Sequence, residues 1–349
     1  MSIFRMKTAV STAALALLLT ACETIPQPDP ARGVPVTASA QTVPVASTDD
    51  AADDPAIWVN TANPAASLIV GTDKQAGLHV YDLSGAERSF LPTGRVNNVA
   101  LIDGVGIGGE EGILVAASDR RDPLTAHVAL FRLDGANGEL TPIGRVEAGP
   151  GEGYGFCMAR SPDGVVHTFL NTKEGAIYHQ RLSVDGEVEV LGTRTLTVPS
   201  QPEGCVVDER TGMLYVGEEM AGIWRFDLET GEGELVVRVA PGQLVADVEG
   251  LALAPSGQDG GYLVASSQGD HAYAVYRLPD HSYAGRFYIA DGETIDGVTE
   301  TDGIELSLAN FGPAFPNGLL VVQDGHTPSR RQNFKLVDWG AVTAALGLE

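Results

Sequence analysis

The chain has 349 residues and carries 22 lysines and arginines against 46 aspartates and glutamates, a formal net charge of −24. So negative a chain is repelled by nucleic acid and by anionic membrane surfaces, and we expect neither as a partner. Once the N-terminal region is set aside, roughly 300 residues remain, which is enough for one large domain with its own core.

The N-terminus predicts export. Residues 1–21 combine the positive charges of Arg5 and Lys7 with an apolar stretch over 13–19, as secretory signal peptides do. Leu19-Thr20-Ala21-Cys22 resembles the lipobox of bacterial lipoproteins, in which the cysteine is lipidated. The alternative is an ordinary signal peptide with a chance cysteine. We expect a lipoprotein anchored through Cys22 alone, and Glu23 favours the outer membrane, with the domain either periplasmic or surface-facing.

Residues 22–48 are rich in Pro, Ala and Thr and show no hydrophobic periodicity, so they predict a flexible tether. Residues 49–349 form the predicted domain, which we expect to be monomeric. Two cysteines remain there, Cys157 and Cys205, both in apolar runs. Export would permit a disulfide between them. Their apolar surroundings favour two buried free thiols, which is the state we expect.

A strand-like phrase recurs along the domain, each time as an apolar run that ends in small or acidic residues. Its copies are 68–73, 113–118, 166–171, 214–219, 262–267 and 319–324. Most copies are followed by an alternating run that ends in a turn, the pattern of a β-strand. Six copies roughly fifty residues apart match one four-stranded blade each, so we predict an all-β, six-bladed β-propeller. A β-sandwich or β-helix explains the spacing poorly. The last segment, 339–346, is the one expected helix.

Acidic residues gather beside the turns of these repeats, at 53–54, 203, 218–219, 247–249 and 302. Calcium takes six to eight oxygen ligands from carboxylates, amides and backbone carbonyls. Loops from distant repeats can supply them together only if the fold brings the loops to one face. Any one of these acids alone would be an ordinary solvated turn residue, but together they predict a calcium site.

The longer motifs around these acids resemble the β-propeller phytases. The match covers the chain in order from about residue 49 and is carried by 49–59, 97–99, 154–156, 203–204, 214–219, 247–251, 265–269, 290–297, 301–304 and 333–335. The resemblance implies a six-bladed propeller that holds several calcium ions. It also implies a calcium-dependent phytase of the 3-phytase type, which hydrolyses phosphate monoesters of myo-inositol hexakisphosphate (phytate), bound as its calcium complex, by attack of a calcium-activated water.

The resemblance also assigns individual residues. The implied ligands of the catalytic calcium ions are Glu203, Glu219, Asp247, Glu249 and Gln268, and Tyr154 lies beside them; Tyr154, Glu203 and Glu219 are the implied catalytic residues. The implied surroundings of the structural calcium ions are Asp53, Asp54, Asn97 and Asp296, with backbone carbonyls from Pro55 and Val99. Asp50 and Asp302 are further candidates. Glu218 should point away from Glu219 because neighbouring residues of a strand face opposite sides.

Three cations, Lys74, Arg120 and Lys173, follow strands of different repeats and match the family's phosphate-binding positions. Arginine can grip a phosphate with two parallel bonds, whereas lysine supplies a point charge. The chain departs from the family pattern at Gln75, where a second lysine is common, at Ala100, which replaces an aspartate, and at Gln41, which replaces an acid.

Two other functions remain open from the residues. A six-bladed calcium-dependent lactonase would need carboxylates near the central channel but no ring of phosphate-binding cations. A non-catalytic, lipid-anchored binding propeller would have lost several of the catalytic acids. The fold by itself does not choose among the three functions.

Overall fold

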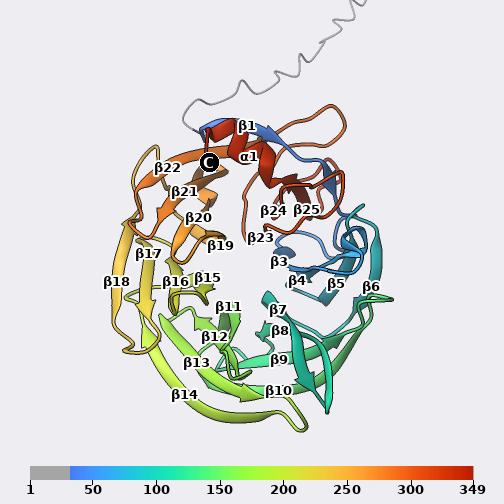
Figure 1. The fold of residues 1–349 in the computed structure, drawn as a ribbon, viewed down its shortest axis with the longest axis vertical. Helices are drawn as coiled ribbons and strands as arrows, with labels where there is room; N and C mark the ends of the chain where they lie inside the picture. The colour runs from blue at the N-terminus through green and yellow to red at the C-terminus, as the bar shows by residue number, and fades with distance from the viewer. Residues whose placement is uncertain (1–31, 349) are drawn as a thin grey trace, which may run out of the picture.

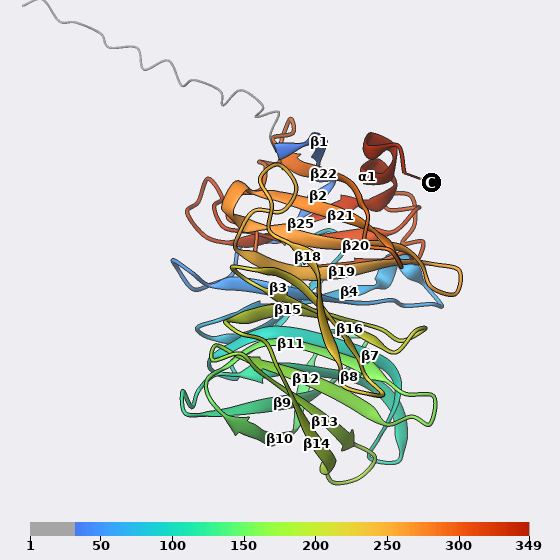
Figure 2. The same ribbon diagram turned by 90° about the vertical axis from the view of Figure 1, so that its left-hand side faces the viewer.

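The computed structural model describes residues 32–348, so the predicted signal peptide, Cys22 and the first part of the predicted tether lie outside the described residues. Six antiparallel sheets radiate from a central axis like the blades of a propeller (Figures 1 and 2). This confirms the predicted six-bladed β-propeller. No helix in the described part of the chain is long and apolar enough to cross a bilayer.

Each blade has an innermost strand at the axis and three more antiparallel strands outward, and blade 5 has a fifth strand at its outer edge. Blade 1 contains β3 (Ala52–Trp58), β4 (Leu68–Asp73), β5 (Gly77–Asp82) and β6 (Glu87–Leu91). Blade 2 contains β7 (Val96–Ile107), β8 (Glu110–Asp119), β9 (Thr125–Leu133) and β10 (Leu140–Pro150). Blade 3 contains β11 (Gly153–Arg160), β12 (Val166–Thr172), β13 (Ala176–Ser183) and β14 (Glu189–Thr197).

Blade 4 contains β15 (Pro202–Asp208), β16 (Met213–Glu218), β17 (Gly222–Asp227) and β18 (Gly233–Arg238). Blade 5 contains β19 (Val248–Ser256), β20 (Gly260–Ser267), β21 (Ala272–Leu278) and β22 (Tyr283–Ala290). Blade 6 contains β23 (Ile304–Ser307), β24 (Leu319–Asp324) and β25 (Asn333–Asp338). Short 3₁₀ turns occupy Pro64–Ala66 and Gln268–Asp270, and the helix α1 spans Trp339–Leu346. Every predicted repeat copy is the second strand of a blade, and the expected helix is α1.

The N-terminal segment closes the ring. The strand β2 (Ala40–Gln41) pairs with β25 and completes blade 6, whose other strands come from the C-terminal end of the chain. The strand β1 (Val34–Thr37) adds a parallel fifth strand to blade 5 beside β22. The prediction of a tether up to residue 48 was therefore wrong from about residue 34 onward. These strands are short, and their partners lie more than two hundred residues away, so local composition does not reveal them.

The core lies between the blades. Each pair of neighbouring blades encloses one apolar cluster, such as the one around Phe131 between blades 1 and 2 and the one around Phe169 between blades 3 and 4. Burying a side chain of this size contributes about 1.5–3 kcal/mol. Blades are therefore joined mainly by side chains, whereas strands within a blade are joined by backbone hydrogen bonds.

The expectation of two free thiols was also wrong. Cys157 on β11 and Cys205 on β15 form a disulfide, with their Cα atoms 5.6 Å apart. That separation is in the usual range for disulfides. The apolar surroundings were predicted correctly, but the sequence does not show that the two inner strands face each other across the junction of blades 3 and 4.

Candidate active site

The innermost strands all place one functional residue at the same end of the axis. In blades 1 to 5 the pairing register of the innermost strand shifts at one dipeptide, between Ala52 and Pro55 in β3 and at the equivalent place in β7, β11, β15 and β19. Such β-bulges redirect side chains and are frequent beside active sites. The residues at these bulges, with the residue that precedes β23 by two, form what we call the acidic mouth: Asp53, Asn97, Tyr154, Glu203, Glu249 and Asp302.

Glycines after the acidic mouth residues let the blades approach closely. A Cβ atom at Gly204 would lie 2.2 Å from the carbonyl oxygen of Glu249, and one at Gly303 would lie 2.2 Å from Oδ1 of Asp54. Both distances are too short for any side chain. The glycine in the motifs Glu203-Gly204 and Asp302-Gly303 is therefore required by packing around the axis, rather than by a turn.

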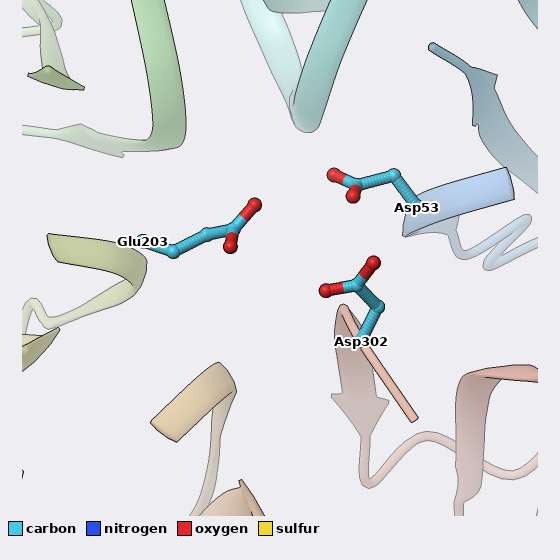
Figure 3. A group of neighbouring side chains, drawn as sticks. All are labelled: Asp53, Glu203 and Asp302. Atoms are coloured by element: carbon cyan, nitrogen blue, oxygen red, sulfur yellow. The ribbon is translucent and has the colours of Figure 1, made fainter. Parts of the chain in front are cut away.

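A first acid group joins three distant parts of the chain. Carboxylate oxygens of Asp53, Glu203 and Asp302 lie within 4.8 Å of one another, and all three residues are buried. Figure 3 shows the three carboxylates pointing toward a common centre. Nδ2 of Asn97 donates hydrogen bonds to Asp53 at 2.9 Å and to Glu203 at 2.7 Å. Asp302 is thus a central member of the site.

A lysine already lies against this group. Nζ of Lys74 lies 2.6 Å from Asp50, 2.8 Å from Asp53 and 3.2 Å from Asp302. Although its burial favours the neutral amine, the Asp302 and Asp53 carboxylates raise the pKa of Lys74 well above its ordinary value. Lys74 was predicted to bind phosphate, but in this structure its ammonium group binds carboxylates.

A second acid group shares Glu203 with the first. Carboxylate oxygens of Glu203, Glu219 and Glu249 also lie within 4.8 Å of one another. Burial, followed by repulsion from Glu203, raises the pKa of Glu219 to about 7. Burial is also the main cause that raises the pKa of Glu203 and, far more, the pKa of Glu249. The group therefore holds more negative charge than its surroundings can stabilise.

The two groups fit a hard cation such as calcium. Their donors are all carboxylate oxygens, the ligands calcium prefers. Oε2 of Glu249 is buried and has no hydrogen-bond partner among the described residues, which is costly unless a cation or water completes it. A bound cation would also remove the repulsion that raises the pKa values of these acids. Asp247 and Gln268 are half-buried beside this group; the Asp247 charge contributes to the raised pKa of Glu219, and the Gln268 N–H donates to the Asp247 carbonyl at 3.0 Å.

A cluster of cations borders the acidic mouth at Tyr154. The Arg120 guanidinium and the Lys173 ammonium lie 5.7 Å and 4.8 Å from the centre of the Tyr154 ring. Arg120 donates from Nε and Nη2 to the Glu152 carboxylate at 2.9 Å and 2.7 Å, and from Nη1 to Asn97. Lys173 lies 3.9 Å from Glu152. Two of the three predicted phosphate-binding cations therefore meet at one place, next to Glu203.

Other predicted residues lie apart from the two acid groups. Asp54 accepts a hydrogen bond from the Val99 amide at 3.0 Å and lines the central channel rather than the mouth; burial raises its pKa well above the ordinary value. Pro55 and Val99 follow the bulges of β3 and β7. Asp296 forms an ion pair with the fully buried Lys335 at 2.7 Å, so a lysine occupies one side of its carboxylate.

Glu218 lies outside both groups, as predicted. Its carboxylate accepts hydrogen bonds from Ser200 at 2.5 Å and from the Trp224 indole at 2.7 Å. Of this Glu-Glu pair, only Glu219 belongs to an acid group. The strand β16 ends at Glu218, so Glu219 already lies in the turn that follows.

Sequence analysis did not identify Glu152, Asn171 or Gln323. Asn171 donates from Nδ2 to the Glu203 carbonyl at 2.6 Å, and Gln323 accepts from the Asp302 amide at 2.9 Å. Asn171 is the last residue of one repeat copy, and Gln323 is the last but one of another. Their place at the end of a repeat is the signal that could have found them. Gln41, assigned to the tether, accepts from the Lys335 ammonium at 2.6 Å.

The fold and the acidic mouth together define a six-bladed propeller in which two acid groups that could hold a metal ion lie beside a cluster of cations. A family model described as Phytase matches residues 6–349. The chain is also 39% identical over 329 residues to the 3-phytase of Bacillus subtilis (strain 168), an alignment that covers 89% of this chain and 85% of that protein. The chain therefore belongs to the phytase family, and the predicted enzyme class is confirmed.

The raised pKa values predict how stability depends on pH without calcium. An acid whose folded-state pKa is raised stabilises the fold while it is protonated, and loses that contribution as pH rises through the folded pKa. In chelator, the melting temperature should therefore fall between about pH 6.5 and about pH 8, where Glu219 with its pKa of about 7 ionises. Histidines such as His179, whose pKa is lowered to about 4 by burial, are then largely neutral in the folded and the unfolded chain. Acids with lowered pKa values, such as Asp73 and Asp119, are already ionised across this window.

Calcium should reverse the trend, because it binds the ionised carboxylates. Calorimetric melts across this pH range, with chelator and with calcium, would measure both effects. Glu219→Gln should flatten the slope seen in chelator. A melting temperature in chelator that rises over the same range would contradict the account.

Proposed function

We propose that this phytase is calcium-dependent and hydrolyses phosphate monoesters of myo-inositol hexakisphosphate, as a 3-phytase does. The observation that carries the proposal is the position of Glu203. It belongs to both acid groups, and its neighbour on the next inner strand is Tyr154, around which Arg120 and Lys173 gather. A cation site at Glu203 and a phosphate site at Arg120 and Lys173 would therefore be neighbours.

The acid groups would hold the calcium ions. Asp53, Glu203 and Asp302 would supply one set of ligands, and Glu203, Glu219 and Glu249 would supply the other, with Asp247 and Gln268 close by. When bound, calcium supplies positive charge that offsets repulsion between the acidic mouth and the substrate, and it activates water for attack on phosphorus. Several bound ions suit a substrate that carries six phosphate groups and enters as its calcium complex.

The chain's own cations would bind the phosphoryl oxygens. Arg120 is buried and fixed by Glu152 and Asn97, so its donors are oriented before substrate arrives. Lys173 is partly exposed and can approach an incoming phosphate. Charge developing on the transferred phosphoryl group is stabilised by such preoriented cations. Lys74 pairs with Asp50, its one exposed partner. If phosphate binding displaces Asp50, Lys74 would bind a phosphoryl oxygen while it still pairs with the buried carboxylates.

Tyr154 would orient the carboxylates rather than attack. Burial, followed by repulsion from Glu203, raises its pKa, so the phenol stays protonated. Its hydrogen bonds to Glu203 and Glu219 offset a small part of the rise in pKa that burial causes at both carboxyls. Because the surrounding carboxylates are used as ligands, we propose direct attack by water without a phosphoenzyme.

The cellular location is a separate part of the proposal and rests on the sequence alone. Residues 1–21 would direct export, and lipidated Cys22 would anchor a monomeric enzyme to the outer membrane, facing the periplasm or the surface. The tether would then be the segment between Cys22 and β1, whose first residue is Val34.

Phosphate release from phytate should require calcium. We expect steady release with calcium and nearly none with chelator, and restoration when calcium is added back. Colorimetric phosphate measurement tests this directly, with a lactone ester as the parallel substrate. Hydrolysis of the lactone with no phosphate release would favour the lactonase, and calcium binding without either activity would favour the binding propeller.

Glu203→Gln should lower turnover by at least roughly 100-fold, because it removes a charge that both acid groups share. The free calcium needed for half-maximal activity should rise as well. Glu218→Gln is the matched control, since Glu218 is also buried but binds Ser200 and Trp224. Equal activity in Glu203→Gln and wild type would exclude Glu203 as a shared ligand.

Arg120→Ala should raise the KM for phytate, and should lower kcat too if the contact strengthens in the transition state. We expect a loss of about 1–3 kcal/mol, the usual contribution of a charge-assisted hydrogen bond. Calcium-dependent stabilisation should persist, because Arg120 ligates no metal. The control is Arg121→Ala, whose guanidinium pairs with Asp119 at 2.5 Å. Normal kinetics in Arg120→Ala would remove the support for phosphate binding at this cluster.

A further inference from the structure

The inner strands of blades 3 and 4 are joined covalently next to the acidic mouth. The disulfide links Cys157 of β11 to Cys205 of β15, and both residues are buried. Along the same two strands, Tyr154 precedes Cys157 by three residues and Glu203 precedes Cys205 by two. The bond therefore ties together the two strands that carry Tyr154 and Glu203.

Backbone pairing does not set the offset between these strands. β11 and β15 belong to different sheets, so no hydrogen-bond ladder joins them. Near the mouth the two strands are held by close packing and by side chains: a Cβ atom at Gly155 would lie 1.8 Å from the Glu203 carbonyl oxygen, and the Glu203 carboxylate accepts a hydrogen bond from Tyr154 of β11. Asn171 of the neighbouring strand β12 donates to the same carbonyl oxygen at 2.6 Å. The disulfide is the next link between the two strands, at Cys205, two residues after Glu203.

The axial side of the two strands offers little support. A cavity of about 200 Å³ lies in the central channel, and its lining includes Phe156, Cys157, Gly204 and Cys205. Space on that side means that packed side chains do not oppose a shift of β15 toward the axis. The apolar cluster around Phe169 packs against the two cysteines from the blade junction, and the covalent link adds a restraint that the open axial side does not supply.

We propose that the Cys157–Cys205 disulfide is a positioning element of the hydrolytic site, which makes calcium binding and turnover sensitive to thiol reductants. The inference rests on the proposed calcium-dependent function. Because Glu203 belongs to both acid groups, a shift of β15 displaces the ligand that the two groups share. A dithiol reductant would supply two electrons and two protons, converting the disulfide to two thiols while it is itself oxidised to a disulfide.

The test is a variant that removes the bond but keeps the apolar volume, Cys157→Ala combined with Cys205→Val. We expect kcat for phytate to fall roughly tenfold, the order expected for a small misplacement of a catalytic group. Calcium affinity, measured by calorimetry without substrate, should fall by roughly tenfold as well, and KM should change less than kcat. Wild-type enzyme treated with dithiothreitol should show the same losses and recover on reoxidation, whereas the variant should not respond.

A staple that only stabilises the fold would behave differently. The melting temperature would drop, but kcat and calcium affinity, measured well below both melting temperatures, would equal those of the wild type; that result overturns the proposal. If the variant fails to fold, wild-type enzyme whose thiols are shown by alkylation and mass spectrometry to be fully reduced carries the test, and unchanged calcium affinity in it is equally decisive. Calcium affinity does not depend on phosphate release, so an error in the proposed reaction would be recognised separately.

Discussion

Repulsion among carboxylates buried at the axis is the constraint on which this structure depends. Two like charges about 4 Å apart cost about 4 kcal/mol at the effective dielectric constant of a protein surface, and the acidic mouth holds several such pairs. The fold nevertheless brings Asp53, Glu203 and Asp302 together. The ion pair with Lys74 and the hydrogen bond from Asn97 offset part of the repulsion. The pKa values of Glu219 and Glu249 are raised because burial and neighbouring carboxylates still disfavour their ionised forms. A site of this kind gains stability from any cation that its geometry admits.

The propeller can hold these charges because backbone hydrogen bonds join the strands within each blade and side chains join neighbouring blades. The bulge repeated in blades 1 to 5 turns one residue of each innermost strand toward the mouth. Between blades, specific contacts take over: Asn97 links blade 2 to blades 1 and 4, Asn171 links blade 3 to blade 4, and the disulfide joins blades 3 and 4 a second time. The position of each ligand thus depends on residues that are not ligands.

The repeat predicted the architecture because every blade repeats the same apolar second strand, and periodicity records that directly. The acids were found because the family's motifs are long. Glu218 was separated from Glu219 correctly, although the strand ends at Glu218 and the turn after it gives Glu219 its direction. Neither signal predicts which acids meet. Asp302, a secondary candidate, is central, while Asp296 binds Lys335, because closure of the ring and not local sequence decides these distances. The same limit explains the errors at β1, β2 and the cysteines, whose partners lie across a blade junction or at the other end of the chain.

The central claim is that two acid groups bind calcium through one shared carboxylate. Crystals grown with calcium, with diffraction data collected where calcium scatters anomalously, would test it most directly. The account predicts one anomalous peak among Asp53, Glu203 and Asp302, a second among Glu203, Glu219 and Glu249, and oxygens of Glu203 bound to both ions. Calcium ions found elsewhere, with Glu203 bound to none of them, would contradict it.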